Sequence, residues 1–429
     1  MRVDGAMIEN PENLIWVADI PRHWARHAPQ KPAMIFEDRT ATYADFDRGA
    51  ASLCANWQAA GYRRGDRIGY FGRNSDLFYY VYFACARGGF VLASYNWRYA
   101  APELQFVLAD SKPRLLIHDD DFTALVEQAC GGLEPAPVCI ATEGSAPSTV
   151  RSLLSGPEKS PTAISYAHND ALLQIYTSGT TGSPKGALIS HGAISLFRSA
   201  YASTPQWENW KTDDIALSAM PNFHIAGIGF VMLAMGVGAT VVHTADPSPS
   251  SLVRLSNTHR TNRVFMVPTV VQMVMDELDA TGCEVPRYDG IYYGAAPIGV
   301  LLQKAIATFG CRFTQFYGMT EAATTHVLGP DEHDPARPHL LKSVGRPIAG
   351  VSMMIRRPDG SRCALGEAGE IWIKSEMLML GYANRPDDTA AAVVGGWYRT
   401  GDGGFVDEQN YLYLTDRLKE MIISGGENI

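Results

Sequence analysis

Short apolar runs alternate with longer amphipathic segments over most of the first 330 residues. The run RIGYFG follows the amphipathic segment ASLCANWQAAGYRRGD, and RLLIHDD follows APELQFVLADS. This alternation is typical of α/β units, in which strands form a mainly parallel sheet and helices cover its faces. The pattern therefore predicts two α/β subdomains with mostly parallel sheets packed in layers with helices, at about residues 1–175 and 176–335.

The pattern changes in the last quarter of the chain. A polar, proline-bearing connection, GPDEHDPARP, occupies residues 329–338. After it, short strand-like runs are joined by glycine turns such as PDG and GDGG, which favour tight connections between antiparallel strands. We therefore expect a small, antiparallel β-barrel-like subdomain at about residues 340–416.

One apolar run is long enough to raise the question of a membrane span. Residues 225–242, IAGIGFVMLAMGVGATVV, contain no charge over eighteen positions, which reaches the lower limit for a transmembrane helix. Gly236 and Gly238 divide the run into a helix-like part and a β-branched part. A buried helix followed by a buried strand explains this pattern better, so we expect no transmembrane segment.

Composition narrows the class of protein. The chain has 429 residues, of which 46% are hydrophobic and 19% charged, as in a soluble globular protein with a large core. A net charge of −9 gives no field that would attract nucleic acid or an anionic membrane, so bound phosphate would need local donors.

Cysteine usage and the first residues point to a cytoplasmic protein. The seven cysteines are scattered without CxxC spacing, which predicts reduced thiols and argues against a disulfide framework or a zinc site. Asp4, Glu9 and Glu12 stand where a signal peptide would need an apolar segment.

The segment YTSGTTGSPKG at residues 176–186 combines five serine and threonine hydroxyls, three glycines and one lysine. A Ser/Gly linker is a poor explanation, because strand-like runs flank it on both sides. A Walker loop is excluded by register, since Ser183 and Pro184 precede Lys185 and Gly186 stands where the magnesium-binding hydroxyl belongs. What remains is a strand-loop-strand phosphate clamp built from backbone N–H groups, hydroxyls and one lysine.

Four further segments carry polar or aromatic residues that an ordinary core does not need. Taken singly, each has a structural explanation that is at least as good: Tyr317 as core, Asp402 as a turn former and Glu321 as a solvated carboxylate. The segments are YYGAAP (292–297), QFYGMTEAA (315–323), YRTGDGG (398–404) and DRLKEMIISGGENI (416–429).

The order of these motifs resembles that of the adenylate-forming superfamily of acyl-CoA synthetases, aryl-CoA ligases, luciferases and peptide-synthetase adenylation domains. The resemblance covers nearly the whole chain. It implies that a carboxylic acid attacks the α-phosphate of ATP to give an acyl-adenylate and pyrophosphate, and that coenzyme A then takes the acyl group. Such chemistry depends on positioning and on neutralising charge in the transition state.

The resemblance implies roles for the residues that match the family motifs. Thr177 and Glu321 would hold Mg2+, because hard oxygen ligands suit that ion. The implied catalytic residues are Thr177, Lys185, His224, Thr320 and Glu321. The implied phosphate-binding residues are Thr177, Ser178, Gly179, Thr180, Thr181, Gly182, Lys185 and Thr320. The implied nucleoside-binding residues are Gly294, Ala295, Ala296, Pro297, Gln315 and Tyr317 for adenine, and Asp402 and Arg417 for ribose.

The acyl side follows from the segment MPNFHIAGIGF at residues 220–230, which resembles the family segment that closes the acyl pocket. His224 would be a gate between the carboxylate end of the pocket and the thiol tunnel. The family's amino-acid-activating branch has an aspartate near this segment, and its absence here argues against an amino acid substrate. The implied pocket residues are Phe223, His224, Ala226, Gly227, Gly229, Val267, Gly318 and Met319. Small residues there leave room for a fatty, aryl or other bulky apolar acid.

The resemblance also gives an expectation for the end of the chain. Family members continue into a smaller C-terminal domain, so residues 1–416 would be the large N-terminal domain and residues 417–429 a hinge stub with Lys419 at the hinge. Without the lysine of that domain, the chain would bind its ligands and turn over poorly.

Two alternatives stay open at this point. The chain could be a non-catalytic nucleotide- or acyl-binding module, or an adenylate-forming enzyme whose acceptor is a carrier protein, an amine or oxygen. The presence of Glu321 argues against the non-catalytic module, because binding alone does not need this carboxylate. The sequence leaves the oligomeric state open, a homodimer included.

Overall fold

The computed structural model describes residues 16–144, 148–177, 183–294 and 301–415, together with the backbone of four two-residue strands near the chain ends. Those four strands form two antiparallel pairs. They are β1 (Arg2–Val3) with β2 (Ala6–Met7), and β24 (Ile423–Ser424) with β25 (Glu427–Asn428).

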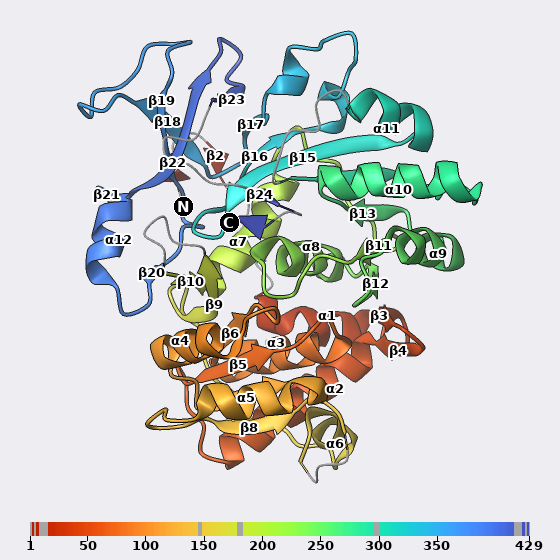
Figure 1. Cartoon of the computed structure of the whole chain (residues 1–429), viewed down its shortest axis with the longest axis vertical. Coiled ribbons are helices and arrows are strands. Elements are labelled where there is room, and N and C mark those ends of the chain that lie inside the picture. The colour runs from red at the N-terminus through yellow and green to blue at the C-terminus, as the bar shows by residue number, and fades with distance from the viewer. Residues whose placement is uncertain are drawn as a thin grey trace.

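The first sheet has seven strands and lies in the lower half of Figure 1. Its strands are parallel except for β10, which pairs antiparallel with both β9 and β20. In spatial order they are β20 (Gly381–Tyr382), β10 (Lys185–Ser190), β9 (Ala171–Thr177), β6 (Val91–Tyr95), β5 (Arg67–Phe71), β7 (Leu115–His118) and β8 (Val138–Ala141).

The second sheet has nine strands. It is parallel from β15 to β3, and antiparallel pairing extends it through β16 and β17 at one end and through β4 at the other. In spatial order the strands are β17 (Arg346–Pro347), β16 (Ala323–Leu328), β15 (Arg312–Met319), β14 (Gly290–Tyr293), β13 (Arg263–Phe265), β11 (Ile215–Ser218), β12 (Thr240–His243), β3 (Pro32–Phe36) and β4 (Arg39–Thr42).

A third, five-stranded sheet is antiparallel throughout and lies at the upper left of Figure 1. Its strands are β18 (Ser352–Arg356), β19 (Gly369–Lys374), β22 (Trp397–Val406), β21 (Val393–Val394) and β23 (Leu412–Leu414). Layered parallel sheets and a small antiparallel sheet are the architecture that the sequence predicted. The subdomain bounds stay a prediction, and the first two sheets each take segments from both sides of residue 176.

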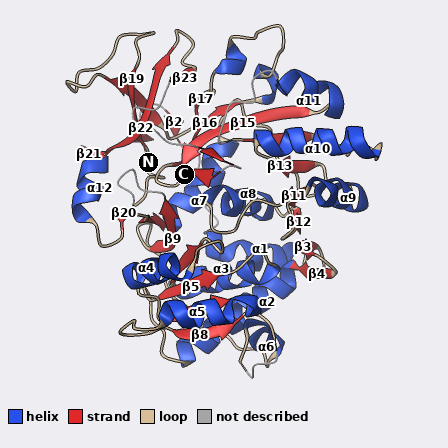
Figure 2. Ribbon diagram, viewed as in Figure 1, coloured by secondary structure: helices blue, strands red, loops and turns tan. Residues whose placement is uncertain are grey.

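Helices pack around and between the sheets (Figure 2). Several begin at the residues that favour a helix N-terminus: Thr42 and Asp45 form a reciprocal capping box at α2, and Ser75 and Ser190 cap α3 and α7. The helices are α1 (Ile20–His27), α2 (Tyr43–Ala59), α3 (Asp76–Gly88), α4 (Ala101–Ser111), α5 (Thr123–Cys130), α6 (Val150–Ser155), α7 (His191–Ala202), α8 (Ile225–Gly236), α9 (Pro249–His259), α10 (Pro268–Thr281), α11 (Leu301–Phe309) and α12 (Pro386–Ala392).

Helix α8 and strand β12 form from the long apolar run, which confirms the predicted buried helix and strand. The helix contacts β11, β12 and α7, and α7 contacts β10, so the two helices lie between the first two sheets. Among the residues that the structure describes, none of the helices has the length and apolar character needed to cross a bilayer. All seven cysteines are free thiols, as expected.

Candidate functional site

The two ends of the predicted phosphate clamp are adjacent in the structure. Strands β9 and β10 pair antiparallel, with Thr177 opposite Lys185, which confirms the strand-loop-strand setting. Residues 178–182 lie outside the described residues, so the structure does not place Ser178, Gly179, Thr180, Thr181 or Gly182.

Glu321 lies in the turn that joins β15 to β16 and accepts two hydrogen bonds on one oxygen. The Thr177 hydroxyl donates to Glu321 Oε1 at 3.2 Å, and the Tyr382 hydroxyl donates to the same atom at 2.9 Å. Burial raises the pKa of Glu321, and these hydrogen bonds together with the charge of Lys185 oppose that rise. The site thus holds a carboxylate beside a threonine hydroxyl, a pair of hard oxygen donors.

Two residues from the segment that precedes β21 contact the Lys185 side chain. Its Nζ lies 2.5 Å from Asp388 Oδ1 in the first turn of α12 and 5.4 Å from the centre of the Tyr382 ring in β20. Backbone hydrogen bonds from Leu380 to Leu188 and from Ala383 to Gly186 join this segment to β10. Asp388 is therefore the ion-pair partner of Lys185 among the described residues, and Glu321 also feels the charge of this lysine.

The predicted nucleoside residues gather at the carboxyl ends of β14 and β15. Tyr317 donates its hydroxyl proton to Asp402 Oδ2 at 2.7 Å, and both side chains are buried. Gln315 accepts a hydrogen bond from the Tyr293 hydroxyl at 3.2 Å. A side chain at Gly294 would be tightly packed, because an added Cβ would lie 3.0 Å from the Phe316 carbonyl oxygen. Ala295, Ala296, Pro297, Arg417 and Lys419 lie outside the described residues.

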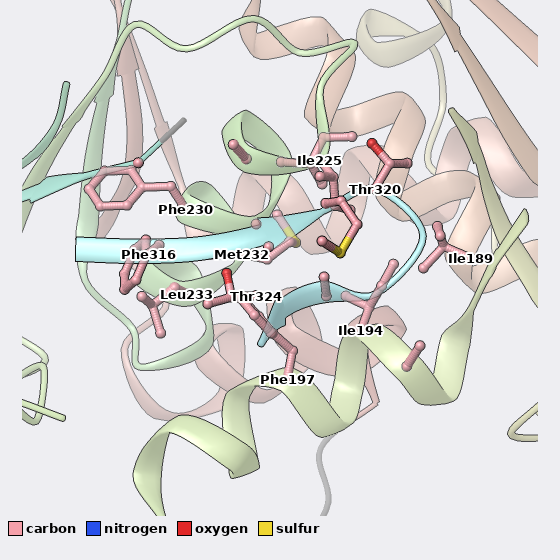
Figure 3. Close-up of a pocket in the computed structure, with 18 of the residues that line it drawn as sticks. Ile189, Ile194, Phe197, Ile225, Phe230, Met232, Leu233, Phe316, Thr320 and Thr324 are labelled. Carbon is pink, nitrogen blue, oxygen red and sulfur yellow. The ribbon is translucent and has the colours of Figure 1, made fainter. Parts of the chain in front are cut away.

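An apolar cavity of about 130 Å³ lies between α7, α8 and the β15–β16 hairpin (Figure 3). In Figure 3, Thr320 and Ile189 lie on one side of it, and Phe230 and Phe316 lie on the other. The described lining residues are Ile189, Ala193, Ile194, Phe197, Tyr201, Ile225, Ala226, Ile228, Gly229, Phe230, Met232, Leu233, Phe265, Gly294, Phe316, Gly318, Met319, Thr320, Ala323 and Thr324.

Half of the predicted acyl-pocket residues line this cavity. They are Ala226, Gly229, Gly318 and Met319. The other four, Phe223, His224, Gly227 and Val267, are absent from its described lining.

The absence of those four residues from the lining has local reasons. Gly227 points its missing side chain at the backbone, since a Cβ there would lie 2.4 Å from the Pro221 carbonyl oxygen. His224 and Val267 are the residues that immediately precede α8 and α10, and Phe223 packs against His224 with ring centres 4.5 Å apart.

Sequence reasoning missed the parts of the site that come from α7 and from the segment around α12. On α7, Ile194, Phe197 and Tyr201 follow helical spacing and share one face. In a sequence, such a stripe looks the same as the buried face of an ordinary core helix, and no signal distinguishes a cavity lining from a core. Tyr382 and Asp388 lie about 200 residues after the clamp and carry no motif that the sequence analysis used.

Known proteins resemble this chain over most of its length. The profile of a family described as AMP-binding enzyme matches residues 21–383. The fatty acid–[acyl-carrier-protein] ligase ScoC of Streptomyces coeruleorubidus is 34% identical over 408 residues, which cover 94% of this chain and 78% of that protein. The feruloyl-CoA synthase of an Amycolatopsis species is 33% identical over 417 residues, covering 95% and 80% of the two chains.

A solved structure has the same fold. The o-succinylbenzoate coenzyme A synthetase (MenE) from Bacillus subtilis, in complex with AMP, superimposes with a TM-score of 0.81 at 27% sequence identity. The match covers 96% of this chain and 80% of that chain. The sheets and helices described above are therefore those of an adenylate-forming enzyme.

Proposed function

The chain belongs to the AMP-binding enzyme family, as the order of its motifs predicted, and from this premise we propose that it activates a fatty, aryl or other bulky apolar carboxylic acid. The acid's carboxylate oxygen attacks the α-phosphorus of ATP, the bond to pyrophosphate breaks, and an acyl-adenylate forms. The sulfur of a thiol then attacks the acyl carbonyl carbon, the bond between the acyl group and AMP breaks, and AMP leaves; we propose coenzyme A as that thiol.

The observation that carries this proposal is the meeting of an apolar cavity and a polar cluster at Thr320. Thr320 lines the cavity, and the next residue, Glu321, accepts hydrogen bonds from Thr177 and Tyr382. An acid with its apolar body in the cavity would present its carboxylate at Thr320. The α-phosphate of ATP would then approach that carboxylate from the polar side, so the two reactants would meet with little further motion.

The residues present fit a magnesium ion. Mg2+ is usually held by one or two protein oxygen ligands while phosphates and waters fill its other positions, and Thr177 and Glu321 offer two such oxygens from adjacent side chains. When bound, the ion would neutralise charge on the β- and γ-phosphates. Burial raises the pKa of the Glu321 carboxyl, and a nearby cation would favour its ionised form.

We further propose that Lys185 binds the outer phosphates and Thr320 the α-phosphate, while Tyr317 stacks on adenine beside Gly294 and Gln315. Asp402 would accept hydrogen bonds from the ribose hydroxyls. Its present partner is the Tyr317 hydroxyl at 2.7 Å, so ribose would share or replace that donor.

The test is a calorimetric titration of AMP into the whole chain and into Asp402→Ala, followed by a pyrophosphate-release assay with a panel of acids. Loss of a hydrogen bond to a charged acceptor is expected to weaken AMP binding by about 1.5–3 kcal/mol. Asp407→Ala, a change on the same subdomain outside the site, serves as the matched control. Unchanged AMP affinity in Asp402→Ala would reject the ribose assignment, and failure of the unmodified chain to bind AMP or ATP would reject the proposal itself.

The acceptor is tested separately. The relatives include a ligase named for an acyl-carrier protein and a synthase named for coenzyme A. Preformed acyl-adenylate offered with coenzyme A or with an acyl-carrier protein distinguishes the two acceptors, because only the true acceptor should accelerate release of AMP.

A further inference from the structure

A buried tyrosine hydroxyl lies in the largely apolar wall of the cavity. Tyr201 lies near the end of α7, is 1% exposed and lines the cavity. Its hydroxyl has no hydrogen-bonding partner of normal geometry within the described part of the chain. Among the described buried polar atoms that share this property, it is the only one whose residue lines the cavity. A buried hydroxyl without a partner is costly, so its placement calls for a ligand group.

The Tyr201 ring is fixed by aromatic neighbours on several sides. It stacks on Trp207 with ring centres 4.2 Å apart, meets Phe197 edge-on at 4.4 Å and contacts Phe316 at 5.7 Å. These contacts hold the hydroxyl in place and prevent the ring from turning toward another partner. The site is therefore rigid before any ligand arrives.

A second hydroxyl lies on the same wall. Thr324 in β16 lines the cavity and is labelled in Figure 3. Burial raises the pKa of Tyr201, and the Thr324 side chain opposes that rise, which makes Thr324 its polar neighbour. Besides Thr320, where the carboxylate is proposed to lie, the cavity wall thus offers two hydroxyl groups, each able to donate or to accept a hydrogen bond.

The size of the cavity restricts what fits beside these hydroxyls. Its volume of about 130 Å³ is close to that of an engineered apolar cavity of about 150 Å³ that binds benzene. One aromatic ring fills such a space. A long alkyl chain would need Phe197, Met232 or Leu233 to move, and the packing density of protein interiors opposes such movement.

We infer that the cavity takes a single-ring aromatic acid that carries a phenolic hydroxyl remote from its carboxylate, with Tyr201 and Thr324 as the residues that determine this specificity. The inference rests on the proposed function, because it assumes that the carboxylate lies at Thr320. A site built to hydrogen-bond a substrate hydroxyl discriminates strongly against the analogue without it, since the buried protein group is then left unpaired.

The test compares matched acids on the whole chain by calorimetry in the presence of saturating AMP. The probes are 4-hydroxycinnamate with cinnamate, 4-hydroxybenzoate with benzoate, and dodecanoate. We expect at least one hydroxylated acid to bind about tenfold more tightly than its partner. Tyr201→Phe should abolish that ratio by weakening the hydroxylated acid, while the affinity for the acid without the hydroxyl stays the same or improves.

Two further variants keep the test decisive. Tyr82→Phe removes another buried hydroxyl that lacks a partner and does not line the cavity, so it should leave the ratio unchanged. Thr324→Val replaces the second hydroxyl at nearly constant volume and serves if Tyr201→Phe does not fold.

The inference would be overturned if both acids of each pair bound equally well, or if dodecanoate bound most tightly. In either case, intact AMP binding would leave the proposed function standing. Failure to bind AMP would overturn both.

Discussion

Asp388 is expected to limit the affinity of the site for ATP. In the absence of nucleotide, its carboxylate is the ion-pair partner of Lys185, with Nζ and Oδ1 2.5 Å apart. The proposed role of Lys185 is to bind the outer phosphates, so a triphosphate must compete with Asp388 for the same ammonium group. Replacement of Asp388 by Asn keeps the shape of the side chain and removes the competing charge.

The magnitude follows from the burial of the pair. The Lys185 side chain is 11% exposed and that of Asp388 is 32% exposed. At this separation and an effective dielectric constant of about 20, the direct attraction is about 7 kcal/mol, and loss of hydration offsets most of it. Exposed pairs contribute about 0.2–1 kcal/mol, whereas breaking a buried pair costs about 3–5 kcal/mol. A net value of about 1–2 kcal/mol is therefore expected for this pair.

In Asp388→Asn, ATP no longer has to displace a charged partner from Lys185. The dissociation constant of ATP should therefore fall about fivefold, which corresponds to about 1 kcal/mol. The assay is isothermal titration with Mg-ATP and, separately, with AMP. AMP lacks the outer phosphates, so its affinity should not change in Asp388→Asn. Stability measured by urea unfolding should fall by about 1–2 kcal/mol in the same variant.

Asp387→Asn is the matched control. Asp387 is exposed and lies beside Asp388 in the first turn of α12, so both variants lose one negative charge near the same helix N-terminus, an effect of about 0.3–1 kcal/mol. Only Asp388→Asn also breaks the pair with Lys185. Weaker ATP binding in Asp388→Asn than in Asp387→Asn would refute competition and indicate that Asp388 orients the lysine toward the phosphates.

Two further predictions concern the carboxylate and the helix beside the cavity. Burial raises the pKa of Glu321 above its ordinary value of 4.5, so the folded protein binds that proton more tightly than the unfolded chain. The corresponding stability is present below the unfolded pKa and is lost as pH rises through the folded pKa. Glu321→Gln is therefore expected to be more stable than the unmodified protein near pH 7, with the gap narrowing toward pH 4.5 in urea unfolding; a gap that widens on acidification would contradict this. Gly227→Ala should destabilise α8 by about 1–3 kcal/mol because the new Cβ would lie 2.4 Å from a carbonyl oxygen. Gly229→Ala should stabilise the fold by about 0.5–1 kcal/mol, since its Cβ would lie at an ordinary contact distance of 3.7 Å from Phe197. The same change narrows the cavity, so calorimetry should show weaker binding of the acid.

The fold was predictable where local pattern and burial agree. The apolar run at 225–242 became α8 and β12 because its two glycines separate a helical part from a β-branched part. The clamp was predictable as strand-loop-strand because its flanking runs are apolar. The sequence pattern could not show which sheet each strand joins. Strands β3 and β4 belong to a sheet whose other strands come more than 170 residues later.

The acyl pocket shows where sequence matching ends. Gly227 and Gly229 are both small, and both were predicted to line the pocket. Successive residues in a helix turn by about 100°, so positions two apart point in nearly opposite directions, and of these two glycines only Gly229 lines the cavity. The helical period shows that the two glycines face different directions, but the face of α8 that meets the cavity depends on its packing against α7 and the β15–β16 hairpin.

The proposed ligand-binding groups already have internal partners. Lys185 pairs with Asp388, Glu321 accepts from Thr177 and Tyr382, and the Tyr317 hydroxyl donates to Asp402. These bonds satisfy buried charges that would otherwise destabilise the folded chain.

The same bonds reduce what a nucleotide can gain, because each new contact with phosphate, metal or ribose must replace an existing one. The affinity of the site is then a difference between two bonded states. The Tyr201 hydroxyl is the exception on the acid side, since no partner of normal geometry among the described residues meets it. A ligand hydroxyl there would displace at most the contact with Thr324, which is why discrimination among acids is expected to depend on that position more than on the residues that the family motifs identify.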